Sequence, residues 1–354
     1  MTTSIRPALK WPGGKRRLLP EILPRIPKHV HTYIEPFIGG GAVFFTLAAE
    51  RRFDHAIISD ADYELIATYR GIRDDPDGVA DRFAEIPQNR EKYYEIRAQD
   101  WRTMSDVQIA ARMIYLNRCA FNGLRRKNRR GQDNAPWGGD QRRKVLDREN
   151  LHACAAVLHD VDIWSGDFEG VMSEAQAGDF VYCDPPYWPI SATSCFCSYG
   201  VGTFGPSDHA RLAAAFRALG ERGASGLLSN SAAPEAVALY EGLHVDRIIA
   251  PRSLNTRSER KAVEELLVSV GPAAQSACER CPMGELCEYG AGFARLARLC
   301  DERASCCGCA VDEHLATHCR DDMCGTCPIS AACTHGQPER CAFLTCPRHW
   351  RGVR

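Results

Sequence analysis

The sequence predicts an α/β fold, in which parallel strands form a sheet with helices on both faces. Apolar segments of strand length recur along the first 270 residues, and helical segments separate the later ones. The first of these strands runs into a glycine-rich turn and then into a helix. Strands that alternate with helices are typical of parallel sheets, whose ligands bind at the carboxyl ends of the strands.

The predicted strands are residues 32–37, 55–60, 179–183 and 224–230. A helix, "GAVFFTLAAE", follows the glycine turn, and a second, "DHARLAAAFRALGER", precedes the last strand. Residues 62–160 interrupt the alternation, because they are helical in pattern and end in a polar, arginine-rich loop. We interpret this segment as a lobe inserted into the sheet domain.

The cysteines indicate a second domain. Five of the 18 lie in residues 1–270 and thirteen lie in residues 278–346, with a change of composition near residues 269–277. Clustered cysteines in a chain without an export signal bind metal more often than they form disulfides. The expected organisation is a sheet domain at 1–61 and 161–272, an insert at 62–160 and a cysteine-rich metal-binding domain at 273–354.

Charge and hydropathy narrow the class of protein. The net charge of the 354 residues is −1, so affinity for a polyanion has to come from a local patch. No apolar run reaches the roughly 18 residues of a membrane span, and the first residues lack a signal-peptide core. We therefore expect a cytoplasmic protein with no membrane partner, and a monomer in solution.

The glycine turn predicts a nucleotide-type cofactor site. Gly39, Gly40 and Gly41 stand between strand and helix, where glycine allows a tight turn and a close approach of the backbone to a ligand. Asp60 follows Gly41 by 19 residues at the end of the next strand, where a carboxylate can accept hydrogen bonds from ribose hydroxyls. The pattern fits NAD, FAD or S-adenosylmethionine, and a tightly packed strand–helix turn is the structural alternative.

The segment "DPPY" predicts the chemistry. Asp184 supplies one acceptor, and the rigid prolines Pro185 and Pro186 direct the Pro185 carbonyl as a second. Two adjacent acceptors suit the NH2 group of a heteroaromatic base, and Tyr187 offers a ring on which that base can stack. Acceptors aimed at the amino hydrogens stabilise the positive charge that develops as the nitrogen attacks a methyl group. The alternative is a plain turn after a strand.

The insert carries a basic segment between residues 117 and 144, with nine Lys or Arg residues against Asp133 and Asp140. Such a density is the footprint of phosphate-backbone contacts, and arginine can also bind guanine edges. The alternative is a solvated loop. The nine residues are Arg118, Arg125, Arg126, Lys127, Arg129, Arg130, Arg142, Arg143 and Lys144.

Together these motifs resemble the Dam-type DNA adenine-N6 methyltransferases. The resemblance covers residues 8–270 and rests on "LKWPGGK", "IEPFIGGGAVF", "SDADYELI", "YLNRCAFNGL", "NRRGQDNAPWG", "VYCDPPYWPISAT", "SYGVGTF", "LLSN" and "VEELL", in that order. It implies a Rossmann-like, S-adenosylmethionine-dependent methyltransferase sheet with an inserted helical DNA-recognition lobe. It also implies double-stranded DNA as partner, with the target adenine flipped out of the duplex.

The resemblance assigns roles residue by residue. The catalytic residues are Asp184, Pro185, Pro186 and Tyr187. The cofactor-binding residues are Trp11, Lys15, Phe37, Gly39, Gly41, Asp60, Asp167 and Asp184. The DNA-binding residues are Arg118, Asn122, Arg126, Asn128, Arg130, Asn134 and Pro136, of which Arg130 matches a guanine-reading arginine and Pro136 a thymine-contacting proline. Lys127 and Asp133 depart from the family, which often has aromatic residues there. Because of these departures, we expect GATC or a related site as the target rather than GATC alone.

The cysteine-rich domain contains the spacing C-x2-C-P-x4-C twice, each time followed 13 residues later by another cysteine. Four thiolates hold a tetrahedral zinc ion or a 4Fe–4S cluster. The repeat resembles WhiB-type iron–sulfur segments, which favours the cluster over zinc; a reduced tail without metal is the alternative. The predicted ligands are Cys278, Cys281, Cys287, Cys300, Cys324, Cys327, Cys333 and Cys346.

The predicted function is site-specific methyl transfer from S-adenosylmethionine to the N6 amino group of adenine in duplex DNA. Cytosine-N4 methylation is one alternative, because that amino group fits the same acceptors. A catalytically inactive, redox-responsive DNA-binding regulator is the other, although the intact "DPPY" argues against it. The sequence leaves open whether the setting is restriction–modification, a phage or chromosomal methylation.

Overall fold

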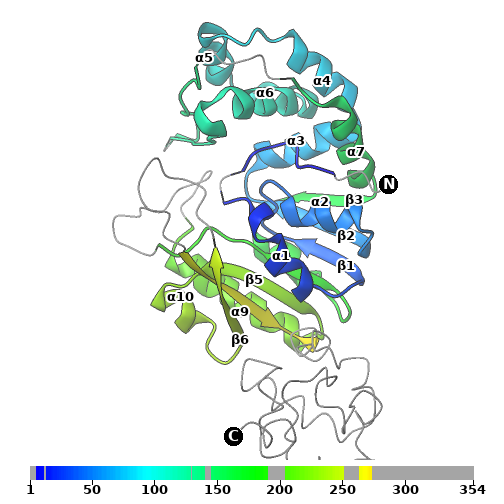
Figure 1. The fold of residues 1–354 in the computed structure, drawn as a ribbon, viewed down its shortest axis with the longest axis vertical. Coiled ribbons are helices and arrows are strands. Elements are labelled where there is room, and N and C mark those ends of the chain that lie inside the picture. The colour runs from blue at the N-terminus through cyan, green and yellow to red at the C-terminus, as the bar shows by residue number, and fades with distance from the viewer. Residues whose placement is uncertain are drawn as a thin grey trace, which may run out of the picture. The chain divides into compact units, whose positions relative to one another are not determined.

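The computed structural model describes residues 5–11, 13–128, 130–139, 145–189, 204–250 and 263–272. They all lie within residues 1–273, the first of two compact units of the chain. Their centre is a seven-stranded sheet with the order β3-β2-β1-β4-β5-β7-β6 (Figure 1). The strands are β1 (Val30–Glu35), β2 (Phe53–Asp60), β3 (Val161–Ser165), β4 (Phe180–Cys183), β5 (Ser225–Ser231), β6 (His244–Ala250) and β7 (Val263–Val270).

The sheet is mixed, which corrects the expectation of parallel strands alone. The five strands from β3 to β5 are parallel, but β7 pairs antiparallel with both β5 and β6. The four predicted strands coincide with β1, β2, β4 and β5 to within two residues at most boundaries. The strands β3, β6 and β7 were not predicted, because charged residues such as Asp162 and Arg247 interrupt their apolar pattern.

Helices cover both faces of the sheet, as predicted. Neighbouring residues of β1 point to opposite faces: Tyr33 packs in the core beneath α2, α3 and α7, and Ile34 packs in the core beneath α8, α9 and α10. The helices are α1 (Leu19–Ile22), α2 (Ala42–Ala49), α3 (Tyr63–Asp74), α4 (Pro76–Glu85), α5 (Arg90–Ala98), α6 (Asp106–Cys119), α7 (Arg148–Leu158), α8 (Phe168–Ser173), α9 (Pro206–Glu221) and α10 (Pro234–Leu239).

A helical lobe is formed by α4, α5 and α6 above the sheet (Figure 1). Its helices start at sequence signals that the chain supplies: Asp75, Asn89 and Ser105 accept hydrogen bonds from backbone amides of the first turns, and Ser105 forms a capping box with Gln108. The lobe joins the sheet through α3, which packs against α6, β2 and β3. The boundaries of an insert at 62–160 stay a prediction.

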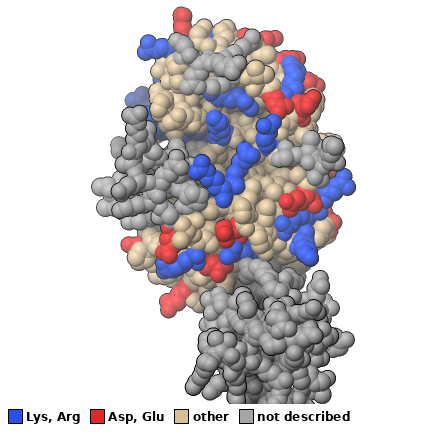
Figure 2. Space-filling model, in the orientation of Figure 1, with Lys and Arg blue, Asp and Glu red and all other residues tan. Residues whose placement is uncertain are grey.

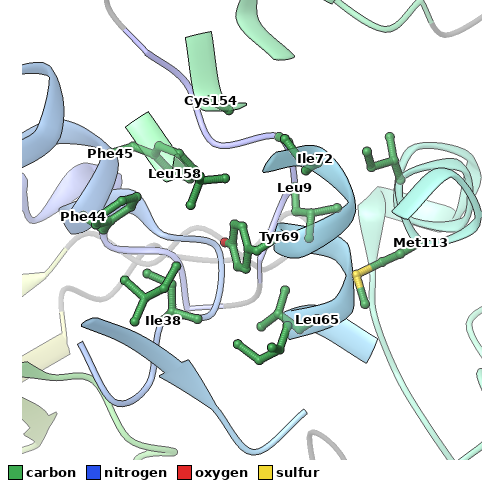
Figure 3. Packing of buried hydrophobic residues seen from close by; sticks show 14 of the residues in the cluster. Leu9, Ile38, Phe44, Phe45, Leu65, Tyr69, Ile72, Met113, Cys154 and Leu158 are labelled. Atoms are coloured by element: carbon green, nitrogen blue, oxygen red, sulfur yellow. The ribbon is translucent and has the colours of Figure 1, made fainter. Parts of the chain in front are cut away.

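The core under the glycine turn is centred on Tyr69 of α3 (Figure 3). Its buried ring lies among Ile38, Leu65 and Phe45, and its hydroxyl donates to the carbonyl of Gly39 at 2.7 Å. The helix α3 therefore supports the turn after β1 from below. No helix in the described part of the chain is long and apolar enough to cross a membrane.

Gly71 marks the closest approach of α3 to α6. A Cβ atom there would lie 2.4 Å from the backbone oxygen of Asp106, so Gly71→Ala should lower the free energy of unfolding by about 1–3 kcal/mol through overpacking. Gly170 in α8 is the matched control, because a Cβ there meets nothing within 4 Å. Gly170→Ala should raise stability by up to about 1 kcal/mol. Urea unfolding checks both, and a fully stable Gly71→Ala variant would contradict this packing.

Candidate active site

The structure brings the predicted cofactor and catalytic motifs to one edge of the sheet. The strands β2, β1 and β4 are neighbours and parallel, so their carboxyl ends lie side by side. Asp60 ends β2, the glycine turn follows β1 and Asp184 follows β4. The topology therefore gathers at one place three motifs that are far apart in the sequence.

The glycine turn is packed against Trp11. Gly39 and Gly41 have φ angles of +47° and +70°, which residues other than glycine rarely adopt. A Cβ atom at Gly39 would lie 2.8 Å from Cδ1 of the Trp11 indole, and one at Gly40 would lie 2.8 Å from its Cβ. The turn therefore presents bare backbone beside an indole ring, and Gly41 caps α2.

Asp60 is held by two backbone amides. Its Oδ2 accepts from the Gly39 amide at 3.1 Å and its Oδ1 accepts from the Asp62 amide at 2.9 Å. Burial raises the pKa of Asp60 to about 6, although these two hydrogen bonds act in the opposite direction. The carboxylate thus has a fixed orientation between the glycine turn and the start of α3.

Asp184 is paired with Lys15. The Lys15 Nζ lies 2.6 Å from Asp184 Oδ1, and the two side chains are 7% and 21% exposed. The same ammonium donates to the Gly13 carbonyl at 2.9 Å and lies 4.7 Å from the centroid of the Tyr187 ring. Burial raises the pKa of Asp184, and the positive charge of Lys15 opposes that rise. Lys15, Asp184 and Tyr187 thus form one cluster.

The rest of the "DPPYW" segment is fixed by β5 and β7. The Tyr187 hydroxyl donates to Glu265 Oε2 at 2.7 Å. The Trp188 amide donates to Asn230 Oδ1 at 3.0 Å, and its carbonyl accepts from the Ser231 hydroxyl at 2.6 Å. Sequence reasoning assigned no role to Glu265 or Asn230. The available signal for a role was position in the sequence. Glu265 lies in "VEELL" and Asn230 lies in "LLSN", on strands that face the motif.

Glu35 is a second buried carboxyl group that sequence reasoning missed. It is 2% exposed, and its Oε2 accepts from the Tyr33 hydroxyl at 2.7 Å and from the Phe44 amide at 3.1 Å. Burial raises its pKa well above the usual range, and the nearby Asp184 adds to that rise. Glu35 links the end of β1 to the first turn of α2. An acidic residue directly before a glycine turn was the available signal.

Phe37 and Asp167 lie on the other side of the glycine turn. The Phe37 ring centroid is 5.4 Å from that of Phe168 and 5.9 Å from that of Phe204. Asp167 Oδ1 caps α8 and accepts from Arg211 at 2.8 Å. The amide of the preceding residue, Gly166, donates to the Asp60 carbonyl at 3.2 Å, which brings this loop beside the end of β2.

The basic segment forms a hairpin of residues 124–137, whose antiparallel bridge joins Lys127 to Asp133. Arg125 and Lys127 are not exposed, which corrects their assignment to a surface patch. Lys127 contacts Asp62 at 3.1 Å and Glu64 at 3.1 Å, and Arg125 contacts the same carboxylates at 2.6 and 3.0 Å. Their side chains are 5% and 9% exposed. These cations are used to hold the hairpin against α3.

Asp133 completes this ion cluster. Its Oδ2 lies 2.9 Å from Arg112 Nη2, and Arg112 of α6 also pairs with Glu64. Three carboxylates thus meet three cations where side chains are less than 10% exposed. We therefore interpret the departures at Lys127 and Asp133 as internal: both side chains point into the protein. The members of the ion cluster are Asp62, Glu64, Arg112, Arg125, Lys127 and Asp133.

Among the described residues of the hairpin, Arg126 and Arg130 are the members of the basic segment that are exposed. Arg126 donates from Nε to Asn134 Oδ1 at 2.7 Å. Asn128 shapes the tip, because its Oδ1 accepts from the amides of Arg130 and Gln132. Figure 2 shows Lys and Arg side chains across the middle of one face, between the lobe and the sheet.

The other residues expected to bind DNA lie beside the hairpin or near its end. Arg118 donates to the carbonyl of Val145 at 3.2 Å. Asn122 is exposed with a φ angle of +54°. Pro136 is exposed, and its carbonyl accepts from the Phe121 amide at 3.0 Å. Arg129, Arg142, Arg143 and Lys144 lie outside the described residues.

The predicted metal ligands, from Cys278 to Cys346, also lie outside the described residues. Within the part of the chain that the structure describes, no group of His, Cys, Asp or Glu residues could hold a metal ion. Cys119, Cys154 and Cys183 are buried in the core. The iron–sulfur or zinc site therefore stays a prediction.

Comparisons with known proteins identify the family of the chain. The chain is 39% identical over 275 residues to the type II methyltransferase M1.LlaDCHI of Lactococcus lactis subsp. cremoris, covering 75% of this chain and 95% of that protein. It is 36% identical to M.MjaIII of Methanocaldococcus jannaschii, covering 75% and 98%, and 31% identical to the DNA adenine methylase of Escherichia coli K12, covering 78% and 99%. The D12 class N6 adenine-specific DNA methyltransferase family matches residues 11–254, and this chain belongs to that family.

Proposed function

We propose that the protein transfers a methyl group from S-adenosylmethionine to the N6 amino group of an adenine flipped out of duplex DNA. The observation that carries the proposal is the cluster of Lys15, Asp184 and Tyr187 beside the glycine turn and Asp60. An acceptor, a ring face and a cofactor carboxylate then lie at one edge of the sheet. Family membership favours adenine over cytosine as the target base.

The residues fit S-adenosylmethionine, which supplies an electrophilic methyl group when it is bound. Gly39 and Gly40 leave the backbone open where any side chain would meet Trp11. Both Asp60 oxygens accept from backbone amides, and each keeps a lone pair for a ribose hydroxyl. We assign the turn from Phe37 to Gly41 to the methionine part, Asp60 to the ribose and the loop at Asp167 to the surroundings of the adenine ring.

The target base would be held by Asp184 to Tyr187. The two hydrogens of its amino group donate to the Asp184 carboxylate and to the Pro185 carbonyl, and its ring stacks on Tyr187. The Lys15 ammonium favours the ionised form of Asp184, the stronger acceptor, and so opposes the effect of burial. As the nitrogen gains positive charge, the Asp184 carboxylate stabilises it and can take up the proton that is released.

Duplex recognition is assigned to the hairpin of residues 124–137 and its flanks, with a target at GATC or a related site. Arg126 and Arg130 are exposed there, while the ion cluster fixes the hairpin to α3. For residues 273–354 we keep the proposal of a 4Fe–4S or zinc site. Measuring the iron and zinc content of the full chain distinguishes the cluster from the zinc site. A monomeric state and a cytoplasmic location are also kept as proposals.

The decisive experiment is the sequencing of methylated bases in DNA from cells that express the protein. It should find N6-methyladenine at one recurrent short sequence. Methylated cytosine at N4 instead would support the rival base, and unmethylated DNA would contradict the proposed function. The same experiment identifies the target sequence that the experiments below need.

Asp184→Asn tests the acceptor at the target base. The variant keeps the shape but loses the negative charge, so turnover should fall by about 10²–10³-fold. Binding of S-adenosylmethionine, measured by calorimetry, should persist. Asp160→Asn is the control, because that side chain is 94% exposed and should leave turnover unchanged. Near wild-type turnover in the Asp184 variant would remove Asp184 from the mechanism.

We predict that cofactor binding depends on pH through the ionisation of Asp60. Because its pKa is raised to about 6, its ionised form is lost as the pH falls through about 6. S-adenosylmethionine affinity should therefore decline below that pH, with a limiting slope of about tenfold per pH unit for one proton taken up. Asp60→Asn should bind more weakly but without this dependence. Calorimetric titrations with S-adenosylmethionine between pH 5 and about 8 measure this dependence. An unchanged slope in Asp60→Asn would show that another group takes up the proton.

Arg130 and Arg126 are expected to behave differently. Arg130→Ala should reduce discrimination at one base pair of the target by about 1–3 kcal/mol. Arg126→Ala should weaken binding to every duplex and lower the salt dependence of binding. Dissociation constants for singly substituted duplexes, measured at several salt concentrations, separate these effects. The same uniform loss in both variants would show that neither arginine reads a base.

A further inference from the structure

A pair of stacked aromatic rings, Tyr63 exposed and Trp101 half-buried, lies beside the recognition hairpin. Tyr63, the first residue of α3, is 46% exposed. Its ring centroid lies 5.7 Å from that of Trp101 in the 3-10 helix Trp101–Thr103, with an angle of 23° between the ring planes. Two large flat side chains from distant parts of the chain therefore form one surface, which we call the aromatic platform.

The aromatic platform is connected to the hairpin and to the cofactor carboxylate. Lys127 Nζ lies 5.7 Å from the Trp101 ring centroid and 3.1 Å from Asp62 Oδ1. The Asp62 amide in turn donates to Asp60 Oδ1 at 2.9 Å. The platform is thus one contact away from the hairpin and stands at the same carboxyl end of β2 as the cofactor site.

Positive charge borders the platform. The Arg102 guanidinium lies 5.0 Å from the Trp101 ring centroid, although it also pairs with Asp100 at 3.1 Å. Lys127 approaches Trp101 from the side of the hairpin. Both cations lie over the Trp101 ring and are already paired with carboxylates, so the platform offers ring stacking for an unpaired base rather than free charge for phosphates.

The hairpin itself offers no such surface. Trp137 is its one aromatic residue, and it packs on Tyr93 with ring centroids 5.3 Å apart. Extrusion of an adenine leaves its partner base unpaired beside a gap in the duplex, at a cost of a few kcal/mol unless the protein replaces the lost contacts. Phe121, which is 51% exposed just before the hairpin, is the rival candidate for this role.

We propose that the Tyr63–Trp101 platform stacks on the base that is left unpaired in the duplex when the target adenine is extruded. The proposal rests on the proposed function, because it needs a flipped base. It adds two base-contacting residues to those expected from the sequence. The platform carries no sequence information of its own, since every base has a flat face; it stabilises the extruded state.

The experiment is a cycle of protein and DNA changes. Binding of two duplexes is measured by fluorescence anisotropy with S-adenosylhomocysteine present: one carries the target sequence, and the other has an abasic site opposite the target adenine. Tyr63→Ala should weaken binding to the intact duplex roughly tenfold and leave binding to the abasic duplex unchanged. Trp101→Ala should behave in the same way, and Tyr63→Phe, which keeps the ring, should bind like the wild type.

Two matched variants complete the design. Trp164→Ala removes another exposed aromatic side chain, 39% exposed on β3, and should change neither affinity. Equal losses on both duplexes after Tyr63→Ala, or no loss, would overturn the proposal. So would a loss confined to the intact duplex in Phe121→Ala with none in Tyr63→Ala. Unchanged thermal unfolding of each variant confirms that the fold is kept.

The outcome is separable from that of the proposed function. A wild-type protein that neither methylates nor binds any duplex would contradict the proposed function itself. A wild-type protein that methylates adenine, while the cycle finds no dependence on the unpaired base, would contradict the platform alone. The calorimetric affinity for S-adenosylhomocysteine should be the same in Tyr63→Ala and wild type, which excludes an indirect effect through Asp60.

Discussion

The arrangement of the two binding regions depends on the buried ion cluster between α3, α6 and the hairpin. A charge taken out of water costs several kcal/mol unless an opposite charge meets it, so no member can leave without exposing its partner to that cost. Asp62 belongs to this cluster, and its backbone amide orients Asp60. The position of the hairpin proposed to bind DNA and the orientation of the carboxylate proposed to bind the cofactor are therefore set by one set of contacts.

Two opposed effects act on the pKa values of Asp184 and Glu35 at the other end of the site. Burial of Asp184 and Glu35 raises both pKa values, and a like charge adds to each rise: Asp184 acts on Glu35, and Glu265 acts on Asp184. Lys15 is the cation at Asp184, while Glu35 relies on a hydroxyl and one backbone amide. The two carboxyl groups thus differ in environment: one is kept as an acceptor at the surface of the site, and the other ties β1 to α2.

The sequence predicted the parts whose signal is local. The glycine turn, Asp60 and the "DPPY" segment were found because strand, turn and polar residue follow one another directly. Glu265 and Asn230 were not found, because their role arises only when β7 inserts antiparallel beside β5. Lys127 and Arg125 were placed on the surface because charge density does not reveal that Asp62 and Glu64, some 60 residues earlier, face them across the fold. The cysteine-rich segment lies beyond the described residues.

The ion cluster also bears on how such enzymes could be re-engineered. A hairpin grafted from a relative with apolar residues at positions 127 and 133 would remove one cation and one carboxylate from this buried cluster. Asp62 and Glu64 would then face only Arg112 and Arg125, or whatever residue replaced Arg125. A graft that also lacked Arg125 would leave Asp62 and Glu64 with one cation between them, so it would need compensating changes at these two carboxylates to hold the hairpin in place.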